Sequence, residues 1–135
     1  MFEGNTIMKT PDLIILYVRD VPASLALYSA LLGTKAVDST PGFALLPFRE
    51  GVMLGLWQAS AVKPAPTTIP GGFELCLHAA DEAGLRARFA EWQARPELSL
   101  EEAPVQRDFG LSFVMRDPDG NRLRMLLPPV REAAA

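Results

Sequence analysis

The sequence predicts an α+β fold made of two βαβββ modules, residues 11–58 and 72–128, joined by a linker at 59–71. Three observations predict it. A strand, a helix and further strands occur in residues 13–57 and again in 73–127, a repeat of roughly 60 residues. Prolines and a Gly-Gly pair separate the two copies, and the length of 135 residues fits one ordinary domain. Because one helix covers only one face of a small sheet, the modules are expected to combine around a shared cleft.

The first module begins with a strand at residues 13–18, which is apolar, β-branched and too short for a typical helix. Asp20 and Pro22 are typical of a helix start and Gly33 of a helix end, so a helix of about three turns follows. The three residues Arg49-Glu50-Gly51 end in glycine and suit the turn of a hairpin. Two antiparallel strands are therefore predicted, at residues 43–48 and 52–57.

The second module repeats this order. Residues 73–78 alternate strictly between apolar and polar side chains, which indicates a strand. Asp81 is a typical helix N-cap, and the helical spacing of Leu85, Phe89 and Trp92 predicts a helix after it. The remaining predicted strand segments are one from Val105, one at 109–115 and, after an Asp-Pro-Asp-Gly turn, one at 122–127.

Charge and cysteine content exclude several classes of protein. Thirteen Lys and Arg against sixteen Asp and Glu give a net charge of −3 without a basic run, so neither a nucleic-acid partner nor an anionic membrane surface is expected. The single cysteine, Cys76, excludes an intrachain disulfide and a cysteine-based zinc site. No apolar run approaches the roughly 20 residues of a membrane span, and residues 1–10 lack the apolar region of a secretory signal. A cytoplasmic protein is predicted.

Two motifs carry a resemblance to a known superfamily. They are LYVRDVPAS at residues 16–24, followed by Leu27-Tyr28 and Leu31-Leu32-Gly33, and DPDGNRL at residues 117–123. With the paired modules, the chain resembles the glyoxalase, bleomycin-resistance and extradiol dioxygenase superfamily, also called the vicinal oxygen chelate fold. The resemblance covers nearly the whole chain. It also implies a homodimer, because chains of this family usually cover apolar sheet surface with a second chain.

Enzymes of this superfamily hold a divalent metal with four His or Glu side chains, one from each of four strands. At the corresponding positions this chain has Leu13, Gly55 (or Met53 in the neighbouring register), Glu74 and Arg124. Only Glu74 could donate an oxygen, and the arginine cation would repel a metal ion. The sequence therefore predicts no metal, no cofactor and no catalytic residue, and it favours binding over catalysis.

Shorter matches make the chain similar to metal-free members of this superfamily that bind phenazine antibiotics. These are Thr40-Pro41, Leu56-Trp57, Glu74 with Trp92, Asp108-Phe109-Gly110, and Asp117–Gly120 with Arg124. The resemblance implies a protein that sequesters a planar aromatic small molecule and so confers resistance. Two alternatives stay open: a metal-dependent glyoxalase-like lyase, isomerase or dioxygenase that recruits Glu74 and His78, and a ligand-sensing module.

Candidate ligand-binding residues lie on the strand faces expected to line the cleft. Trp57 shares its face with Gly55, whose missing side chain is expected to leave space beside the indole, and an indole stacks well on planar rings. Leu13 and Tyr17 share a face of the first strand, and Tyr17 could add a hydroxyl or a second aromatic wall. Core packing is the alternative for both aromatic residues. The phenylalanines, Phe109 among them, are interpreted as packing residues.

The polar candidates lie in the second module. Glu74, Cys76 and His78 share one face of their strand, and the apolar residues between them are expected to pack on the helix. Nucleophilic chemistry at Cys76 is disfavoured, since side chains at i and i+2 of a strand point side by side and no third orienting group is evident. Arg124 needs an acidic partner, for which Glu74 is the candidate. That pair either holds the two halves together or leaves Arg124 to bind a ligand carboxylate.

Overall fold

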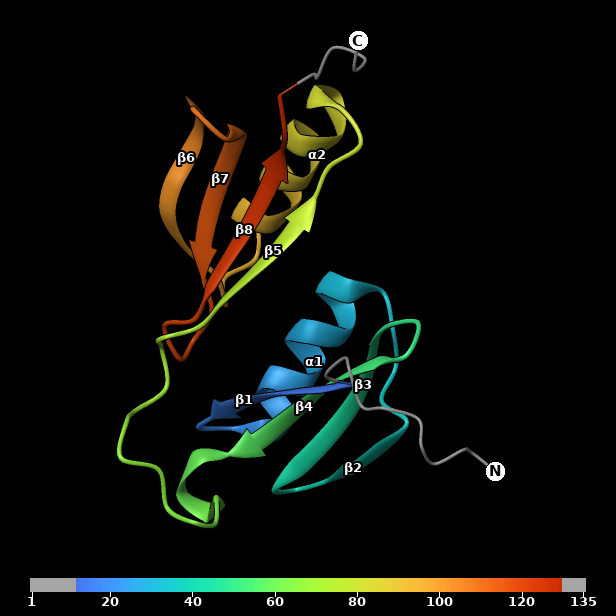
Figure 1. Ribbon diagram of the computed structural model, residues 1–135, viewed down its shortest axis with the longest axis vertical. Coiled ribbons are helices and arrows are strands. Elements are labelled where there is room, and N and C mark those ends of the chain that lie inside the picture. The colour runs from blue at the N-terminus through green and yellow to red at the C-terminus, as the bar shows by residue number, and fades with distance from the viewer. Residues whose placement is uncertain (1–11, 130–135) are drawn as a thin grey trace, which may run out of the picture. The chain divides into compact units, whose positions relative to one another are not determined.

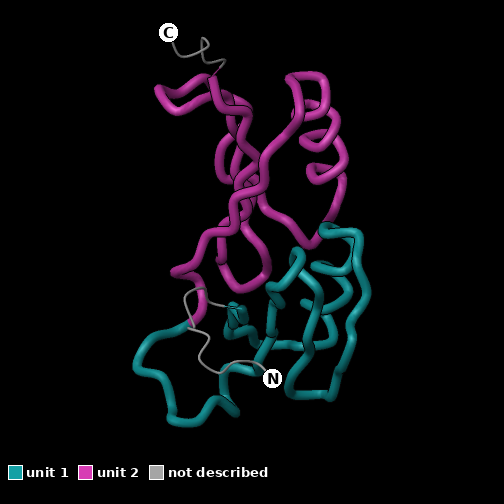
Figure 2. The backbone as a smooth tube through the Cα atoms, turned by 45° about the vertical axis from the view of Figure 1, so that its right-hand side comes forward, with its two compact units in different colours: residues 1–69 teal, residues 70–135 magenta. Residues whose placement is uncertain are grey.

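The computed structural model describes residues 12–129 and confirms the α+β class (Figure 1). By its internal contacts the chain divides into two compact units, Met1–Ile69 and Pro70–Ala135, shown in different colours in Figure 2. The first contains β1 (Leu13–Val18), α1 (Val21–Leu32), β2 (Asp38–Thr40), β3 (Phe43–Arg49), β4 (Val52–Gln58) and the short 3₁₀ helix η1 (Ala59–Ala61). The second contains β5 (Glu74–His78), α2 (Glu82–Gln93), β6 (Ser99–Arg107), β7 (Gly110–Arg116) and β8 (Arg122–Leu127).

The two units have the same topology, which confirms the predicted βαβββ repeat. Their sheets have the strand orders β1-β4-β3-β2 and β5-β8-β7-β6. In each sheet the first strand of the unit pairs in parallel with the last, and the remaining pairs are antiparallel. Each unit therefore carries one helix on a four-stranded sheet, as Figure 1 shows.

Helix capping follows the local sequence signals. The Asp20 carboxylate accepts a hydrogen bond from the backbone N–H of Ala23 at 3.0 Å, and α1 ends at Gly33, whose φ of 67° favours glycine. The Asp81 carboxylate accepts from the N–H of Gly84 at 2.7 Å in the same way and starts α2. Both predicted caps are confirmed, so the helix starts are fixed by local chemistry.

Each helix buries one face of its own sheet. In the first unit Leu16, Leu54 and Leu56 are buried together with Tyr28 of α1. In the second unit the aromatic rings of Phe89 and Trp92 of α2 meet Phe113 of β7 edge to face, at centroid distances of 5.2 and 5.5 Å. The other face of each sheet is left uncovered by the unit's helix.

Two strands differ from the prediction. Strand β2 is three exposed polar residues at a sheet edge, a segment without the apolar pattern that identifies strands. Strand β6 begins at Ser99, six residues before the predicted start. Its first residues are mostly exposed and its pairing with β7 contains register shifts, so this part of the strand lacks the regular apolar alternation on which the prediction relied. Within residues 12–129, neither helix is long and apolar enough to cross a membrane.

Candidate functional site

The N-terminal sheet presents an apolar face away from α1, here called the N-terminal open face. Alternation along β1 and β4 places on it Leu13, Ile15, Tyr17, Met53, Gly55 and Trp57. Tyr17 is the register partner of Trp57 on β4, and Trp57 is the partner of Phe43 on β3. The predicted candidates Tyr17 and Trp57 are thus brought together in one aromatic row, with Phe43 as a third member.

The surroundings of Trp57 correct one expectation. Its ring meets that of Phe43 edge to face, with centroids 6.0 Å apart and an interplanar angle of 90°. A Cβ placed on Gly55 would lie 3.1 Å from the Phe43 ring and 3.4 Å from the Ile15 side chain. The space over Gly55 is therefore filled by Phe43 and Ile15, and the expectation of open space beside the indole was wrong.

A pocket of about 380 Å³ lies at the other end of the same strands. It is lined by Asp12, Leu13, Leu45, Gly51, Val52 and Met53. The predicted candidate Leu13 is part of it, 41% exposed, whereas Trp57 is not. Within this unit, Leu13 and Trp57 therefore occupy opposite ends of the N-terminal open face.

The C-terminal sheet presents a polar face away from α2, here called the C-terminal open face. It carries Glu74, Cys76 and His78 from β5 and Arg122, Arg124 and Leu126 from β8. Glu74, Cys76 and His78 are all exposed, while Leu75 between them is buried, as the alternation predicted.

Glu74 and Arg124 form the predicted ion pair. The Nε of Arg124 donates to Oε2 of Glu74 at 2.8 Å, and the two side chains are 16% and 35% exposed for Arg124 and Glu74 respectively. Both residues belong to the second module, so the pair links β5 to β8. The expectation that it holds the two halves together was wrong, because residues 50 positions apart in sequence are neighbours within one sheet.

The guanidinium of Arg124 is held on three sides. Besides the bond to Glu74, Nη1 donates to Oγ of the buried Ser112 at 3.0 Å, and Cζ lies 5.4 Å from the ring centroid of Phe109. The hydrogen bond to Glu74 raises the pKa of Arg124 above its ordinary value, so the side chain is a permanent cation. A charged donor of fixed orientation is the arrangement that recognises carboxylates well.

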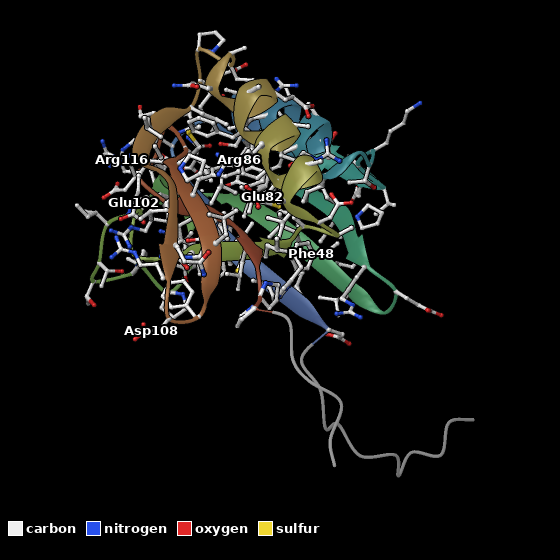
Figure 3. All side chains as sticks on the ribbon, turned by 90° about the horizontal axis from the view of Figure 1, so that it is seen from above. Phe48, Glu82, Arg86, Glu102, Asp108 and Arg116 are labelled. Carbon is white, nitrogen blue, oxygen red and sulfur yellow. The ribbon has the colours of Figure 1, made fainter. Side chains whose placement is uncertain are left out.

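Arg124 belongs to a larger set of paired charges, here called the arginine network. One continuous series of ion pairs joins Arg116, Glu101, Arg122, Glu74 and Arg124, and a separate pair joins Arg107 to Glu102. Together the four arginines and three glutamates carry one net positive charge. Figure 3 shows Glu102 and Arg116 on this hairpin side of the unit, with Asp108 at the turn and Glu82 and Arg86 on α2. The members of the network are Arg107, Arg116, Arg122, Arg124, Glu74, Glu101 and Glu102.

A pocket of about 390 Å³ lies among these charges. Its lining residues are Glu101, Glu102, Arg107, Phe109, Val114, Arg122 and Arg124. Phe109 contributes the aromatic surface of this pocket and is 48% exposed, so the interpretation of Phe109 as a packing residue was wrong. Its place at the tip of the β6–β7 hairpin was the signal that could have found it, because a phenyl ring at a turn does not reach the core.

The thiol of Cys76 is not activated as a nucleophile. Partial burial raises the pKa of the Cys76 thiol above its usual value, and the neighbouring Glu74 carboxylate adds to the rise while Arg124 opposes it. A nucleophilic cysteine needs the opposite shift. Within residues 12–129, no group of three or more His, Cys, Asp and Glu side chains is arranged to hold a metal ion.

The four positions at which the superfamily holds its metal do not fit such an ion here. Leu13 and Gly55 offer no donor atom, and Arg124 offers only N–H donors. The remaining carboxylate, Glu74, accepts a hydrogen bond from Arg124 and lies 3.8 Å from Nη1 of Arg122. A carboxylate that is already paired with arginines, with a permanent cation beside it, is a poor ligand for a divalent cation.

The repeated topology of the two units is typical of a known class of protein, and a family model identifies that class. Residues 10–125 match the model of the glyoxalase/bleomycin resistance protein/dioxygenase superfamily. The chain belongs to this superfamily, as its sequence motifs indicated.

Three individual proteins are similar to this chain. The chain is 27% identical over 124 residues to the phenazine antibiotic resistance protein EhpR of Enterobacter agglomerans, covering 90% of this chain and 93% of EhpR. It resembles the solution structure of protein ATC0852 from Agrobacterium tumefaciens, with 37% identity, a TM-score of 0.81 and coverage of 91% and 100% of the two chains. It shares its fold with TnmS3, an antibiotic binding protein from Streptomyces sp. CB03234, with 22% identity, a TM-score of 0.69 and coverage of 92% and 99%.

Proposed function

We propose that this protein binds a planar aromatic, carboxylated small molecule of phenazine type without a metal ion and confers resistance by sequestering it. The observation that carries the proposal is Arg124, which stands at a metal-ligand position of the superfamily, is kept charged by its hydrogen bond to Glu74 and is held in place by Ser112. A site that holds a permanent cation there attracts an anion in place of a metal. The likeness to EhpR, a phenazine antibiotic resistance protein by name, supports the ligand class.

Each open face by itself offers one kind of contact that suits such a ligand. Trp57 offers an aromatic surface with Tyr17 as its register partner, suited to stacking on a planar ring system. Arg124 offers a charge-assisted donor for the acid group. In this proposal Glu74 positions Arg124. Leu13 lies at the opposite end of the N-terminal open face from Trp57, and Gly55 is covered by other side chains, so neither contacts a ring stacked on Trp57.

Calorimetric titration tests the ligand class. We expect phenazine-1-carboxylic acid to bind with a micromolar or tighter Kd, a free energy of about −8 kcal/mol or better, while cyclohexanecarboxylic acid, which is neither planar nor aromatic, does not bind. Arg124→Met should weaken binding of the acid about 10- to 150-fold and leave binding of unsubstituted phenazine unchanged, since a hydrogen bond to a charged group contributes about 1.5–3 kcal/mol. Arg86→Met, on the exposed surface of α2, is the matched control and should change neither affinity.

Metal analysis separates this proposal from a metal-dependent enzyme. Protein purified without chelators should contain substoichiometric nickel, zinc, iron and manganese, and EDTA should leave ligand affinity unchanged. Stoichiometric metal together with turnover of a substrate would reverse the proposal.

Expression in a phenazine-sensitive bacterium should raise the inhibitory concentration of a phenazine antibiotic, and Arg124→Met should lower that protection.

We also propose that the protein is a cytoplasmic homodimer. The N-terminal open face is apolar and carries Leu13, which is 41% exposed, and chains of this superfamily usually cover such a sheet surface with a second chain. A chain with one unpaired cysteine also suits a reducing compartment. Light scattering at micromolar concentration should give twice the chain mass, and a purely monomeric protein would contradict the dimer.

A further inference from the structure

We propose that Phe109 is a ligand-binding residue whose ring, with Arg124 beside it, makes the pocket on the C-terminal open face selective for planar aromatic monoanions. The inference rests on the proposed function and extends it in two ways. It adds a recognition residue that the family comparison does not assign, and it fixes the charge of the group that the pocket accepts.

The position of Phe109 has no role in the folding core. The residue lies in the two-residue turn between β6 and β7 and is 48% exposed. The turn is fixed by Gly110, whose φ of 130° is rarely adopted by other residues. A Cβ at this position would overlap the carbonyl oxygen of Leu127. The constrained turn fixes the backbone of Phe109, and the contact of its ring with Arg124 limits the side chain further, so its immobilisation on binding costs less entropy.

The ring lies where it can act together with the cation. The Cζ atom of Arg124 is 5.4 Å from the Phe109 ring centroid, within the range of a cation–π contact. Two other groups of the same guanidinium, Nε and Nη1, donate to Glu74 and Ser112. Among the described residues no hydrogen bond uses Nη2, which leaves this donor for a ligand oxygen. An aromatic acid can then place its carboxylate at Nη2 and its ring against Phe109.

The charges that line the pocket set the charge of the ligand. Three arginines, Arg107, Arg122 and Arg124, face two glutamates, Glu101 and Glu102, so the lining carries one net positive charge. Both glutamates already accept bonds from arginines of the network. A single carboxylate neutralises the excess, whereas a dianionic phosphate ester places a second negative charge beside the glutamates. The pocket therefore favours a carboxylate over a phosphate monoester.

Binding measurements on the full-length protein test the inference. The variant is Phe109→Leu, which keeps an apolar side chain and removes the π face. Its matched control is Leu100→Ala, which truncates another exposed apolar residue of the same hairpin, 45% exposed and outside the pocket. The probes are phenazine-1-carboxylic acid, its neutral carboxamide, 1-naphthoic acid and 1-naphthyl phosphate.

We expect the wild-type protein to bind each acid at least about tenfold more tightly than the carboxamide or the phosphate ester, because a charge-assisted contact is worth roughly 1.5 kcal/mol or more. Phe109→Leu should weaken binding of both acids about 3- to 10-fold, in line with the usual strength of aromatic pairs. Leu100→Ala should leave all affinities unchanged. In ¹⁵N spectra, 1-naphthoic acid should shift the Arg124 Nε–H signal in the wild-type protein, and by less in Phe109→Leu.

The outcomes separate this inference from the proposed function. If phenazine-1-carboxylic acid binds and Phe109→Leu binds it equally well, the role of Phe109 is refuted and the proposed function stands. Equal affinity for acids, carboxamide and phosphate ester refutes the charge selectivity. If neither phenazine binds but 1-naphthoic acid binds in a Phe109-dependent way, the phenazine assignment fails and the inference stands. If no probe binds, both are overturned.

Discussion

Gly110 is the residue at which a single methyl group should have the largest structural effect near the proposed pocket. It follows Phe109 and begins β7 with a φ of 130°. A Cβ there would overlap the carbonyl oxygen of Leu127 and lie 2.9 Å from Cα of Pro128, both of them backbone atoms that cannot rotate away. Gly110→Ala therefore has to distort the pairing of β7 with the end of β8.

The expected loss of stability follows from two separate costs. Holding alanine in a sparsely populated backbone conformation costs about 1–3 kcal/mol. Steric overlap in a packed region adds about 1–3 kcal/mol. The sum, about 2–6 kcal/mol, is a large fraction of the roughly 5–15 kcal/mol by which an ordinary domain is stable. Gly110→Ala should also weaken binding of aromatic acids, because the distorted turn moves Phe109.

Gly120→Ala is the matched control, since Gly120 also has a positive φ, 87°, and lies in the same unit. A Cβ at Gly120 meets only Cα of Gly71, at an ordinary 3.6 Å. Its cost should be that of the backbone conformation alone, about 1–2 kcal/mol. Urea unfolding followed by circular dichroism gives both values from the midpoints and slopes. If Gly110→Ala is no less stable than Gly120→Ala, the steric argument is refuted.

Two further predictions concern the open faces. Glu74→Gln should lower the pKa of the Cys76 thiol, because it removes the carboxylate that helps to raise that pKa. More thiolate is then present at pH 8, so iodoacetamide should alkylate Cys76 faster than in the wild-type protein. An unchanged alkylation rate would exclude the electrostatic contact. Gly55→Ala should displace the Phe43 ring, which lies 3.1 Å from the added Cβ, and should change the near-UV circular dichroism of Trp57 at a stability cost of about 1–3 kcal/mol. An identical near-UV spectrum would place Phe43 elsewhere.

Local signals were sufficient to predict the repeat and both helices. Asp20, Gly33 and Asp81 act within a few residues of the backbone groups they contact, so their roles can be read directly from the sequence. Alternation along β5 and β8 also placed Glu74 and Arg124 on one face, and their ion pair was predicted correctly. Strand β2 was missed because an exposed three-residue edge strand has no apolar pattern.

Features that depend on strand register could not be predicted in the same way. The ring of Phe43 fills the space over Gly55 because β3 and β4 pair with Phe43 opposite Trp57, one row away from Gly55. Likewise, Phe109 contacts Arg124 because the β6–β7 turn carries it to β8, 15 residues away in sequence. A single sequence specifies neither the register nor the direction of a turn residue.

Fluorescence titration with phenazine-1-carboxylic acid tests whether Trp57 stacks on the ring system of the ligand that Arg124 is proposed to hold. Trp92, the other tryptophan, lies on the buried face of α2, is 1% exposed and serves as an internal reference. We expect saturable quenching in the wild-type protein. In Trp57→Leu the quenching should be lost, and calorimetry should show about 2- to 10-fold weaker binding. Unchanged affinity in Trp57→Leu, or quenching that persists without Trp57, would contradict it.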